Sequence, residues 1–334
     1  MKHFTRIADL DVAGVTSVLD EAQAWKSQGP GAHLVGKLLG MVFFNPSLRT
    51  RASFEAAMLR GGGNAVVLDV GNGVWKLEDR IGAVMDGDRP EHIKEAIPVL
   101  GRYADALAVR TFGALVDDDA DARDPVLNAF RELAGVPVIS MESAREHPCQ
   151  GLADLLTLRE NFGNTKSLPV TLTWAPHIKP LPKAVPHSFL LTAAAAGCEV
   201  RVTHPPGFDL HAGVLAEAKR YAQFAGGSVT VTQDRKAALA GSRAVYAKAW
   251  GPDTLQVPLD AVAARIAQHR DWMVDPKVLS IARDPIFLHC LPVRRNVEVA
   301  DAVLDGASSR VIDEAENRFH VQRVLLHRLL NAKD

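Results

Sequence analysis

The stretch "FFNPSLRTRASFEAAMLRGGG", residues 43–63, changes character at its proline. Two phenylalanines close an apolar run typical of a strand, and Ser47, Arg49, Thr50 and Arg51 follow the proline directly. From there the apolar residues take helical spacing. Serine is a common N-cap, and the unsatisfied N–H groups of a first helical turn bind anions. The stretch predicts a strand followed by a helix whose N-terminus holds an anion.

The same alternation of strand and helix patterns runs along the chain. Short runs rich in Val, Leu and Ile alternate with longer segments of helical period, which is typical of parallel sheets covered by helices. The strands are expected over 40–44, 64–69, 105–110, 136–141, 169–174, 199–203, 228–232, 243–247 and 286–288. The helices are expected over 12–26, 50–60, 91–103, 124–133, 150–161, 185–196, 212–224 and 314–331. The predicted fold class is α/β, with doubly wound parallel sheets.

Length and pattern together predict two domains. A chain of 334 residues is long for a single core. Segments 40–141 and 169–312 each hold several strand–helix units, and the helix over 150–161 links them. The last helix is amphipathic, with an apolar stripe made of Val321, Val324, Leu325, Leu329 and Leu330.

Composition narrows the class of protein. The 38 basic and 39 acidic residues give a net charge of -1, so we expect no nucleic-acid or membrane surface. Cys149, Cys198 and Cys290 lack the spacing of a zinc site or a disulfide scaffold. No apolar run reaches the length of a membrane helix, and the N-terminus lacks a signal-peptide core. We expect a cytoplasmic protein without a metal or cofactor.

Polar residues follow the predicted strands at the points where active sites of parallel α/β sheets form. Arg49 and Thr50 follow the first strand, Arg110 ends another, and Glu142 and "HPCQ" (147–150) follow a third. "YAKAWG" (246–251) and "HCLPVRRN" (289–296) follow two more. The pattern predicts a two-domain enzyme with a cationic cleft. On the first motif alone, the alternative that Ser47 only caps a helix and the arginines are solvated stays open.

The residues of "HPCQ" suit a ligand with a carbonyl oxygen and an NH2 group, although a histidine after a strand is often only a hydrogen-bonded loop residue. A neutral His147 imidazole can hold a carbonyl oxygen, and the Gln150 amide can hold an NH2 group. No GxGxxG or GxxxxGK[ST] motif follows any strand, so nucleotide binding is weakly supported.

Three motifs in order, "SLRTR", "HPCQ" and "HCLP", resemble the carbamoyltransferases of the aspartate/ornithine transcarbamylase superfamily, over essentially the whole chain. The resemblance implies a carbamoyl-phosphate domain over 1–149, an amino-acid domain over 150–313, and a last helix, 314–332, that packs back on the first domain. It implies a homotrimer with sites at subunit interfaces. The small-molecule substrates would be carbamoyl phosphate and an amine.

The resemblance also implies residue roles. Ser47, Leu48, Arg49 and Thr50 would cradle the phosphate, and Arg110 would bridge the phosphate and the carbonyl oxygen that His147 polarises. The carbamoyl NH2 would be held by Gln150 and the carbonyls around Cys290 and Leu291. The residues implied to bind carbamoyl phosphate also include Pro148, Cys149, Arg318 and, from a neighbouring subunit, Trp75.

The amine substrate is suggested by a missing motif. Ornithine enzymes carry a D-x-x-x-S-M-G segment for the free amino acid, whereas this chain reads "YAKAWG". "TWAPHIKPLPKAVPHSF" (173–189), "VMDGD" (84–88) and "DEAENR" (313–318) are similar to the N-acylornithine branch, which acts in arginine biosynthesis. In that branch Glu142 and Lys248 hold the acylornithine, and a Pro-rich loop like 176–186 is knotted.

The acyl group is either succinyl or acetyl. A succinyl carboxylate needs cationic neighbours and no acid beside it. Pro90 stands where acetyl-specific relatives place Glu, and His177, Lys179 and Lys248 supply positive charge, which favours N-succinylornithine. The alternative is that Pro90 is only the first residue of a helix, with N-acetylornithine as the acceptor.

One position departs from the relatives. Glu298 stands where some of them have a lysine that can be carboxylated, so a native carboxylate would replace the modified one and pair with Lys248. The alternative is a solvated surface glutamate at a helix start. Two rival functions also stay open, an ornithine carbamoyltransferase and a non-catalytic anion-binding homologue.

Overall fold

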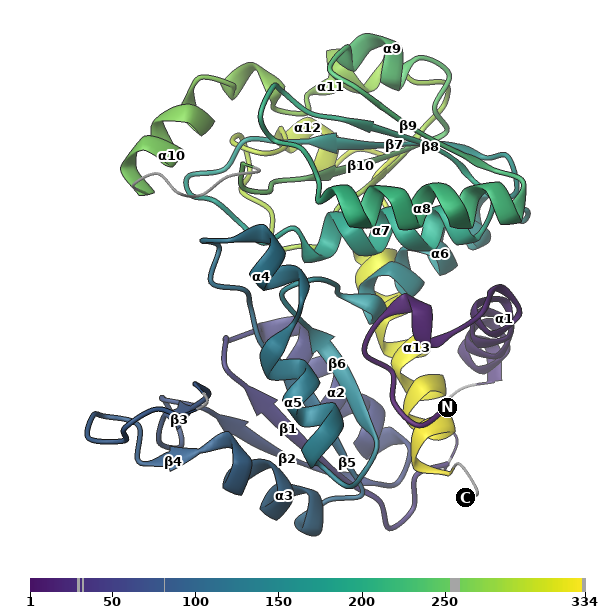
Figure 1. The fold of residues 1–334 in the computed structure, drawn as a ribbon. Helices are drawn as coiled ribbons and strands as arrows, with labels where there is room; N and C mark the ends of the chain where they lie inside the picture. Colours follow the sequence, from purple (N-terminus) through teal and green to yellow (C-terminus); the bar gives the residue numbers. More distant parts are fainter. Residues whose placement is uncertain (29–30, 32, 81, 253–258, 332–334) are drawn as a thin grey trace. The chain divides into compact units, whose positions relative to one another are not determined.

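The computed structural model describes residues 1–28, 31, 33–80, 82–252 and 259–331. It divides into two compact units (Figure 1). The first comprises Met1–Gly113, Arg123–Cys149 and Arg318–Asp334, and the second comprises Ala114–Ala122 and Gln150–Asn317. The chain therefore passes from one unit to the other inside helix α6 (Pro148–Phe162) and returns inside helix α13 (Val311–Leu330). Residues 114–122 belong to the second unit, which no strand–helix pattern indicates.

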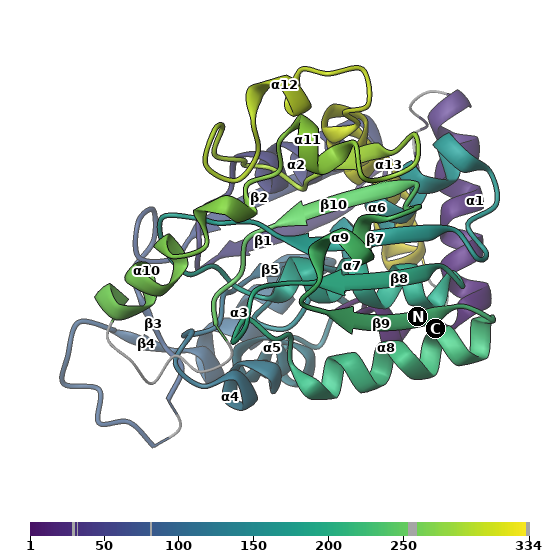
Figure 2. The ribbon, with the colours of Figure 1, turned by 90° about the horizontal axis from the view of Figure 1, so that it is seen from above.

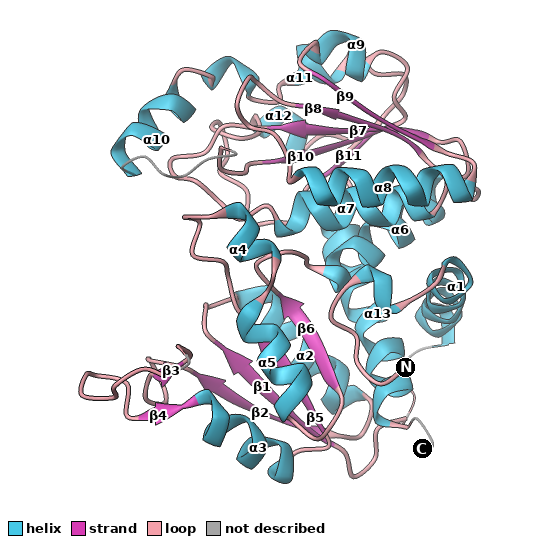
Figure 3. Ribbon diagram, viewed as in Figure 1, coloured by secondary structure: helices cyan, strands magenta, loops and turns pink. Residues whose placement is uncertain are grey.

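The first unit is built on a parallel sheet with strand order β2-β1-β5-β6. Helices α3 and α5 cover one face, where the side chains of Ile97, Leu107 and Phe130 form part of the core (Figure 3). Its elements are η1 (Ile7–Asp9), α1 (Val12–Gln28), β1 (Leu38–Phe43), α2 (Leu48–Arg60), β2 (Asn64–Asp69), β3 (Leu77–Glu78), β4 (Glu91–His92), α3 (Ile93–Tyr103), β5 (Ala106–Arg110), α5 (Pro125–Leu133) and β6 (Val138–Glu142).

The second unit is built on a parallel sheet with strand order β11-β10-β7-β8-β9, which Figure 2 shows from above. Helices α7 and α8 cover one face and the shorter α9, α11 and α12 the other (Figure 3). Its elements are α4 (Asp118–Ala122), β7 (Pro169–Trp174), α7 (Ala184–Ala195), β8 (Glu199–Thr203), α8 (Ala212–Ala225), β9 (Ser228–Thr232), α9 (Arg235–Leu239), β10 (Ala244–Lys248), α10 (Leu259–Ala267), η2 (Arg270–Trp272), α11 (Pro276–Leu279), β11 (Ile286–Leu288) and α12 (Asp301–Leu304).

The α/β architecture with parallel sheets is confirmed, because every strand pairing in both sheets is parallel. The expected apolar stripe of the last helix is also confirmed. All five of its residues are buried, and Arg328 on the same helix pairs with Glu21 of α1 inside the first unit. Among the described residues, no helix has the length and apolar character needed to cross a membrane.

Candidate active site

Helix α2 begins where strand β1 has just ended, with Ser47 as its N-cap as predicted. Ser47 is extended, and its Oγ accepts a hydrogen bond from the Thr50 N–H at 3.3 Å. Arg51, the second guanidinium of this stretch, forms ion pairs with Glu55 and Asp69 at 3.3 and 3.1 Å on the exposed side. Arg49 and Thr50 lie in the first turn of this helix, whose N-terminus favours an anion.

Helix α13 brings a second guanidinium to this helix start. Arg318 Nη2 donates to Thr50 Oγ1 at 2.7 Å, although 268 residues separate the two in sequence. Burial lowers the pKa of Arg318, and the positive charges of Arg110 and Arg49 act in the same direction, whereas Cys149 and Glu142 oppose it. Gathered like charges with little water are stabilised by an anion placed among them.

The third guanidinium, Arg110, lies at the ends of the neighbouring strands β5 and β6. Their register places Arg110 opposite Glu142, and the two buried side chains form an ion pair. His147 Nε2 lies 3.8 Å from the same Glu142 carboxylate. The first unit thus gathers Arg49, Thr50, Arg110, Glu142, His147 and Arg318.

His147 is held in its neutral form. Burial lowers its pKa well below the ordinary value, and the charges of Arg318, Arg110 and Arg49 lower it further. A neutral imidazole carries one N–H, which can donate to a carbonyl oxygen without adding a charge. Burial also raises the pKa of the adjacent Cys149 thiol to about 12, so that this thiol stays protonated at neutral pH.

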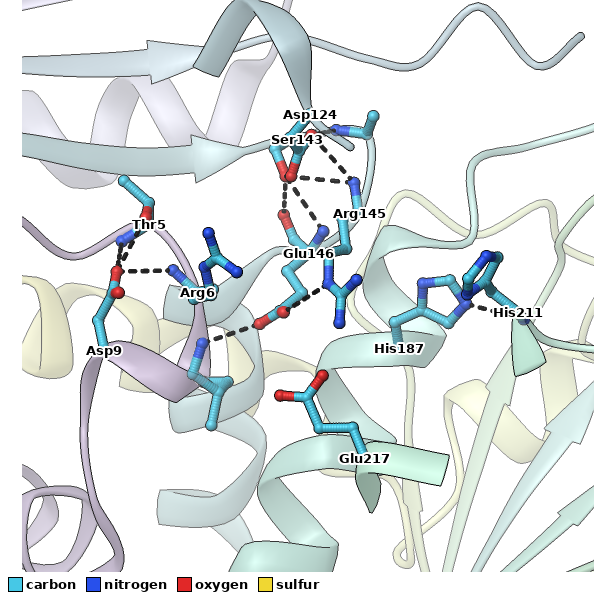
Figure 4. Close-up of polar contacts among 12 residues, drawn as sticks. Thr5, Arg6, Asp9, Asp124, Ser143, Arg145, Glu146, His187, His211 and Glu217 are labelled. Atoms are coloured by element: carbon cyan, nitrogen blue, oxygen red, sulfur yellow. Dashed lines mark hydrogen bonds and ion pairs between the residues drawn. The ribbon is translucent and has the colours of Figure 1, made fainter. Parts of the chain in front are cut away.

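The turn before His147 is anchored by a partly buried carboxyl group, Asp124 (Figure 4). Asp124 accepts hydrogen bonds from Ser143 Oγ at 2.7 Å and from the Ala144 N–H at 2.9 Å. Glu146 in the same turn accepts from the Ile7 N–H at 2.8 Å. Sequence analysis missed both carboxylates. Their role is to fix the backbone that leads into His147.

Asp124 makes the stability of the protein depend on pH. Burial raises the pKa of this carboxyl to about 6, against the lowering effect of its hydrogen bonds. Above pH ~4 the unfolded chain loses this proton while the folded chain still holds it. The free energy of unfolding therefore falls as pH rises from ~4 through about 6. Asp124→Asn, which keeps a similar shape, is expected to gain about 2 kcal/mol relative to wild type between pH 4.5 and 7.5. Urea unfolding of both proteins at the two pH values measures it. A difference independent of pH would contradict the assignment.

In the second unit, the predicted residues gather around Glu314. The Gln150 amide donates to Glu314 Oε1 at 3.0 Å and to Asp154 Oδ1 at 2.7 Å. The other oxygen of Glu314 accepts the His289 N–H at 2.9 Å, directly before Cys290 and Leu291. Sequence analysis did not assign roles to Asp154 and Glu314. The spacing of Gln150 and Asp154, one helical turn apart, was the available signal.

Lys248 and Glu298 form another buried group of the second unit. Glu298 is 1% exposed and accepts the Arg294 N–H at 2.6 Å, so the alternative of a solvated surface glutamate is wrong. Burial raises the pKa of Glu298, and the charge of Lys248 opposes this effect. His177 receives a hydrogen bond from Arg294 Nε at 3.0 Å, and Lys179 is exposed nearby.

Trp75 lies two residues before β3 and Pro90 directly before β4, and these two strands pair with each other on an extension of the first unit (Figure 1). Trp75 is 61% exposed, and its indole N–H donates to Glu91 at 2.7 Å. The alternative that Pro90 opens a helix is wrong. Helix α3 begins at Ile93 with His92 as its N-cap, and residues 91–92 form β4 instead.

Comparisons with known proteins agree on one family. A model of the carbamoyl-phosphate-binding domain of aspartate/ornithine carbamoyltransferases matches residues 2–160, and a model of their Asp/Orn-binding domain matches residues 182–329. N-acetylornithine carbamoyltransferase of Xanthomonas campestris is 40% identical over 99% of this chain and 98% of its own length. N-succinylornithine carbamoyltransferase of Bacteroides thetaiotaomicron is 40% identical over 99% of both chains.

Solved structures give the same result. The crystal structure of acetylornithine transcarbamylase complexed with acetylcitrulline matches with a TM-score of 0.96 and 40% identity, over 99% of this chain and 100% of that one. The protein is therefore an enzyme that transfers a carbamoyl group, and it belongs to the aspartate/ornithine carbamoyltransferase family. Within the family, it is more similar to these N-acylornithine enzymes than to the ornithine carbamoyltransferase of Gloeobacter violaceus, which is 34% identical.

Proposed function

We propose that this enzyme transfers the carbamoyl group of carbamoyl phosphate to the δ-amine of N-succinyl-L-ornithine, giving N-succinylcitrulline and phosphate in arginine biosynthesis. The observation that supports the phosphate half is the cluster of Arg49, Arg110 and Arg318 beside a neutral His147. The same chemistry with N-acetylornithine is the second candidate, since both kinds of enzyme are 40% identical to this chain.

The residue roles form the mechanistic part of the proposal. The N-terminus of α2, with Ser47 as its cap, and the N–H groups of Leu48, Arg49 and Thr50 would hold the phosphate. Arg110 and His147 would polarise the carbonyl oxygen, and Arg318 would fix Thr50. Glu142 would release Arg110 to carbamoyl phosphate and accept an N–H of the acylornithine instead. Gln150 and the carbonyls around Cys290 and Leu291 would accept from the carbamoyl NH2.

The reaction is a direct acyl transfer. The neutral δ-amine attacks the carbamoyl carbon and forms the new C–N bond while the C–O bond to phosphate breaks. The leaving phosphate takes the amine proton. His147 and the arginines stabilise the charge that develops on the carbonyl oxygen and on the phosphate, and that stabilisation lowers the barrier.

The preference for succinyl rests on the site's charge. We place Pro90 where acetyl-specific relatives carry glutamate. A solved N-acetyl-L-ornithine transcarbamylase in which a glutamate is replaced by proline was crystallised with carbamyl phosphate and N-succinyl-L-norvaline. His177, Lys179 and Lys248 would provide the positive field for the succinyl carboxylate.

We further propose a homotrimer in which Trp75 reaches the phosphate of a neighbouring subunit. The support is that this indole is 61% exposed on an extension of the first unit. Tryptophan is enriched at protein–protein interfaces relative to the rest of the surface. Trp75→Ala would then leave the trimer mass unchanged by light scattering while raising the KM for carbamoyl phosphate.

The deciding experiment measures ureido-product formation from carbamoyl phosphate with ornithine, N-acetylornithine and N-succinylornithine in parallel. Turnover with succinylornithine alone supports the proposal. Turnover with acetylornithine alone would support carbamoyl transfer to an N-acylornithine but show that the acyl group is acetyl. Turnover with ornithine alone would show that "YAKAWG" does not indicate an N-acylated substrate. Phosphate-dependent thermal stabilisation without any turnover would favour the non-catalytic homologue.

Glu298 gives a separate prediction. It would act as a permanent carboxylate that neutralises buried Lys248. Glu298→Gln keeps the acceptor for the Arg294 N–H but removes the charge, and is expected to raise the KM for the acylornithine by about tenfold. Glu298→Lys is expected to be inactive until bicarbonate partly restores turnover by carboxylating the new amine. Steady-state assays with and without bicarbonate measure both effects, and unchanged activity of Glu298→Lys in both conditions would rule out the role.

A further inference from the structure

Three buried polar side chains of the second unit form a closed group. Gln150 and Asp154 lie one turn apart on α6, and Glu314 of α13 contacts both. All three are almost completely buried, at 1%, 0% and 0% exposure. Both carboxyl groups lie beside the same amide NH2. Burial and the neighbouring charge of Asp154 raise the pKa of Glu314 well above its ordinary value.

This carboxyl pair fixes which end of the Gln150 amide is available. Both carboxyl groups accept from Nε2, at 2.7 and 3.0 Å, so the two N–H groups of the amide are used. The opposite end, Oε1, is buried and accepts no hydrogen bond from any residue within the described ranges. A buried acceptor without a donor carries a cost, which a ligand with an N–H group can remove.

Glu314 also positions, through His289, the backbone carbonyl of Leu291, which is the other proposed acceptor for the carbamoyl NH2. Glu314 Oε2 accepts the His289 N–H at 2.9 Å, and His289 Nδ1 accepts the Leu291 N–H at 3.0 Å. Leu291 has φ of +54°, a left-handed conformation that costs a branched residue roughly 1–2 kcal/mol. The two hydrogen bonds hold this backbone, so the Leu291 carbonyl is presented in one fixed conformation.

We propose that the Asp154–Glu314 pair is a positioning device that makes this enzyme select carbamoyl phosphate by its N–H donors. The pair presents the Gln150 amide and, through His289, the Leu291 segment as acceptors only. An acyl phosphate with a methyl group in place of NH2 leaves those acceptors unpaired and is rejected. Asp154 and Glu314 are positioning residues, and the inference rests on the proposed role of Gln150 at the carbamoyl NH2.

The test uses two stable analogues that differ only at the selected group. Phosphonoacetamide and acetonylphosphonate share a phosphonate and a carbonyl group, but the first has NH2 where the second has CH3. Calorimetric Kd values for the full-length enzyme are expected to favour the amide by about 10- to 100-fold. Glu314 accepts from both the Gln150 NH2 and the His289 N–H, so in Glu314→Gln the new NH2 group must face one of these two donors. One of the two positioned acceptors, the Gln150 oxygen or the Leu291 segment, is then lost. The preference is then expected to fall below about threefold, with affinity for inorganic phosphate unchanged.

Two further variants make the result decisive. Asp154→Ala removes one of the two carboxyl groups that hold the Gln150 NH2, so Gln150 is no longer fixed, and it decides alone if Glu314→Gln fails to fold. Gln150→Met removes the selecting oxygen itself. If Gln150→Met retains the preference, the proposed role of Gln150 is wrong, and this inference with it. If Gln150→Met loses the preference while Glu314→Gln and Asp154→Ala retain it, the role of Gln150 stands and the positioning role is overturned. Equal weakening of all ligands with the preference retained also overturns it.

Discussion

Arg110→Met is expected to lower kcat/KM by about 10²–10³-fold, because it removes a fixed donor from the charge that develops on the carbonyl oxygen. Methionine keeps most of the side-chain volume, so the strand ends around residue 110 should remain packed. Steady-state kinetics at saturating acylornithine measure the effect. The loss should fall mainly on kcat, since donors aimed at the reacting oxygen act most strongly in the transition state.

The ion pair with Glu142 requires a control. Removing Arg110 leaves a buried carboxylate without its main partner, which can itself distort the site. Arg110→Met should therefore also be made on a Glu142→Gln background, which carries no charge at that position. If the loss caused by Arg110→Met disappears on that background, the effect came from the stranded carboxylate, and the catalytic role of Arg110 is wrong.

Local signals in the sequence predicted the helix start at which the first unit's anion site is proposed. The strand–Pro–Ser–Arg–Thr order specifies a helix start through capping, which depends on neighbouring residues only, and Ser47 accepts the expected hydrogen bond. The contact of Arg318 with Thr50 is different. It joins positions 268 residues apart, so only the family resemblance could suggest that Arg318 serves the same site.

The hydrophobic pattern of the sequence did not predict very short strands or the environment of individual polar side chains. The strands β3 and β4 have two residues each, too few to show an alternation, and β4 replaced the first turn expected for helix 91–103. Nothing in the sequence distinguishes Asp154 and Glu314 from ordinary exposed acidic residues. Only the packing of α6 and α13 in the second unit reveals that both accept hydrogen bonds from the Gln150 amide.

Pro90→Glu is expected to convert the acyl preference. If Pro90 lies beside the succinyl group as proposed, a carboxylate there repels the succinyl carboxylate, and the kcat/KM for N-succinylornithine should fall by about 10- to 100-fold. The repulsion does not act on N-acetylornithine, whose acyl group is uncharged, so the ratio of the two specificity constants should move toward acetyl. Competition between the two substrates in one assay measures that ratio directly.

Pro90→Gln is the matched control, because a glutamine side chain has nearly the same shape as a glutamate side chain but carries no charge. Helix α3 does not depend on Pro90 for its start, since His92 is its N-cap, so both variants should fold alike. A charge effect predicts that Gln keeps most of the succinyl activity and Glu loses it, with a smaller difference at high salt. Equal losses in both variants would mean that the proline acts through the backbone, and the electrostatic account of acyl selection would be wrong.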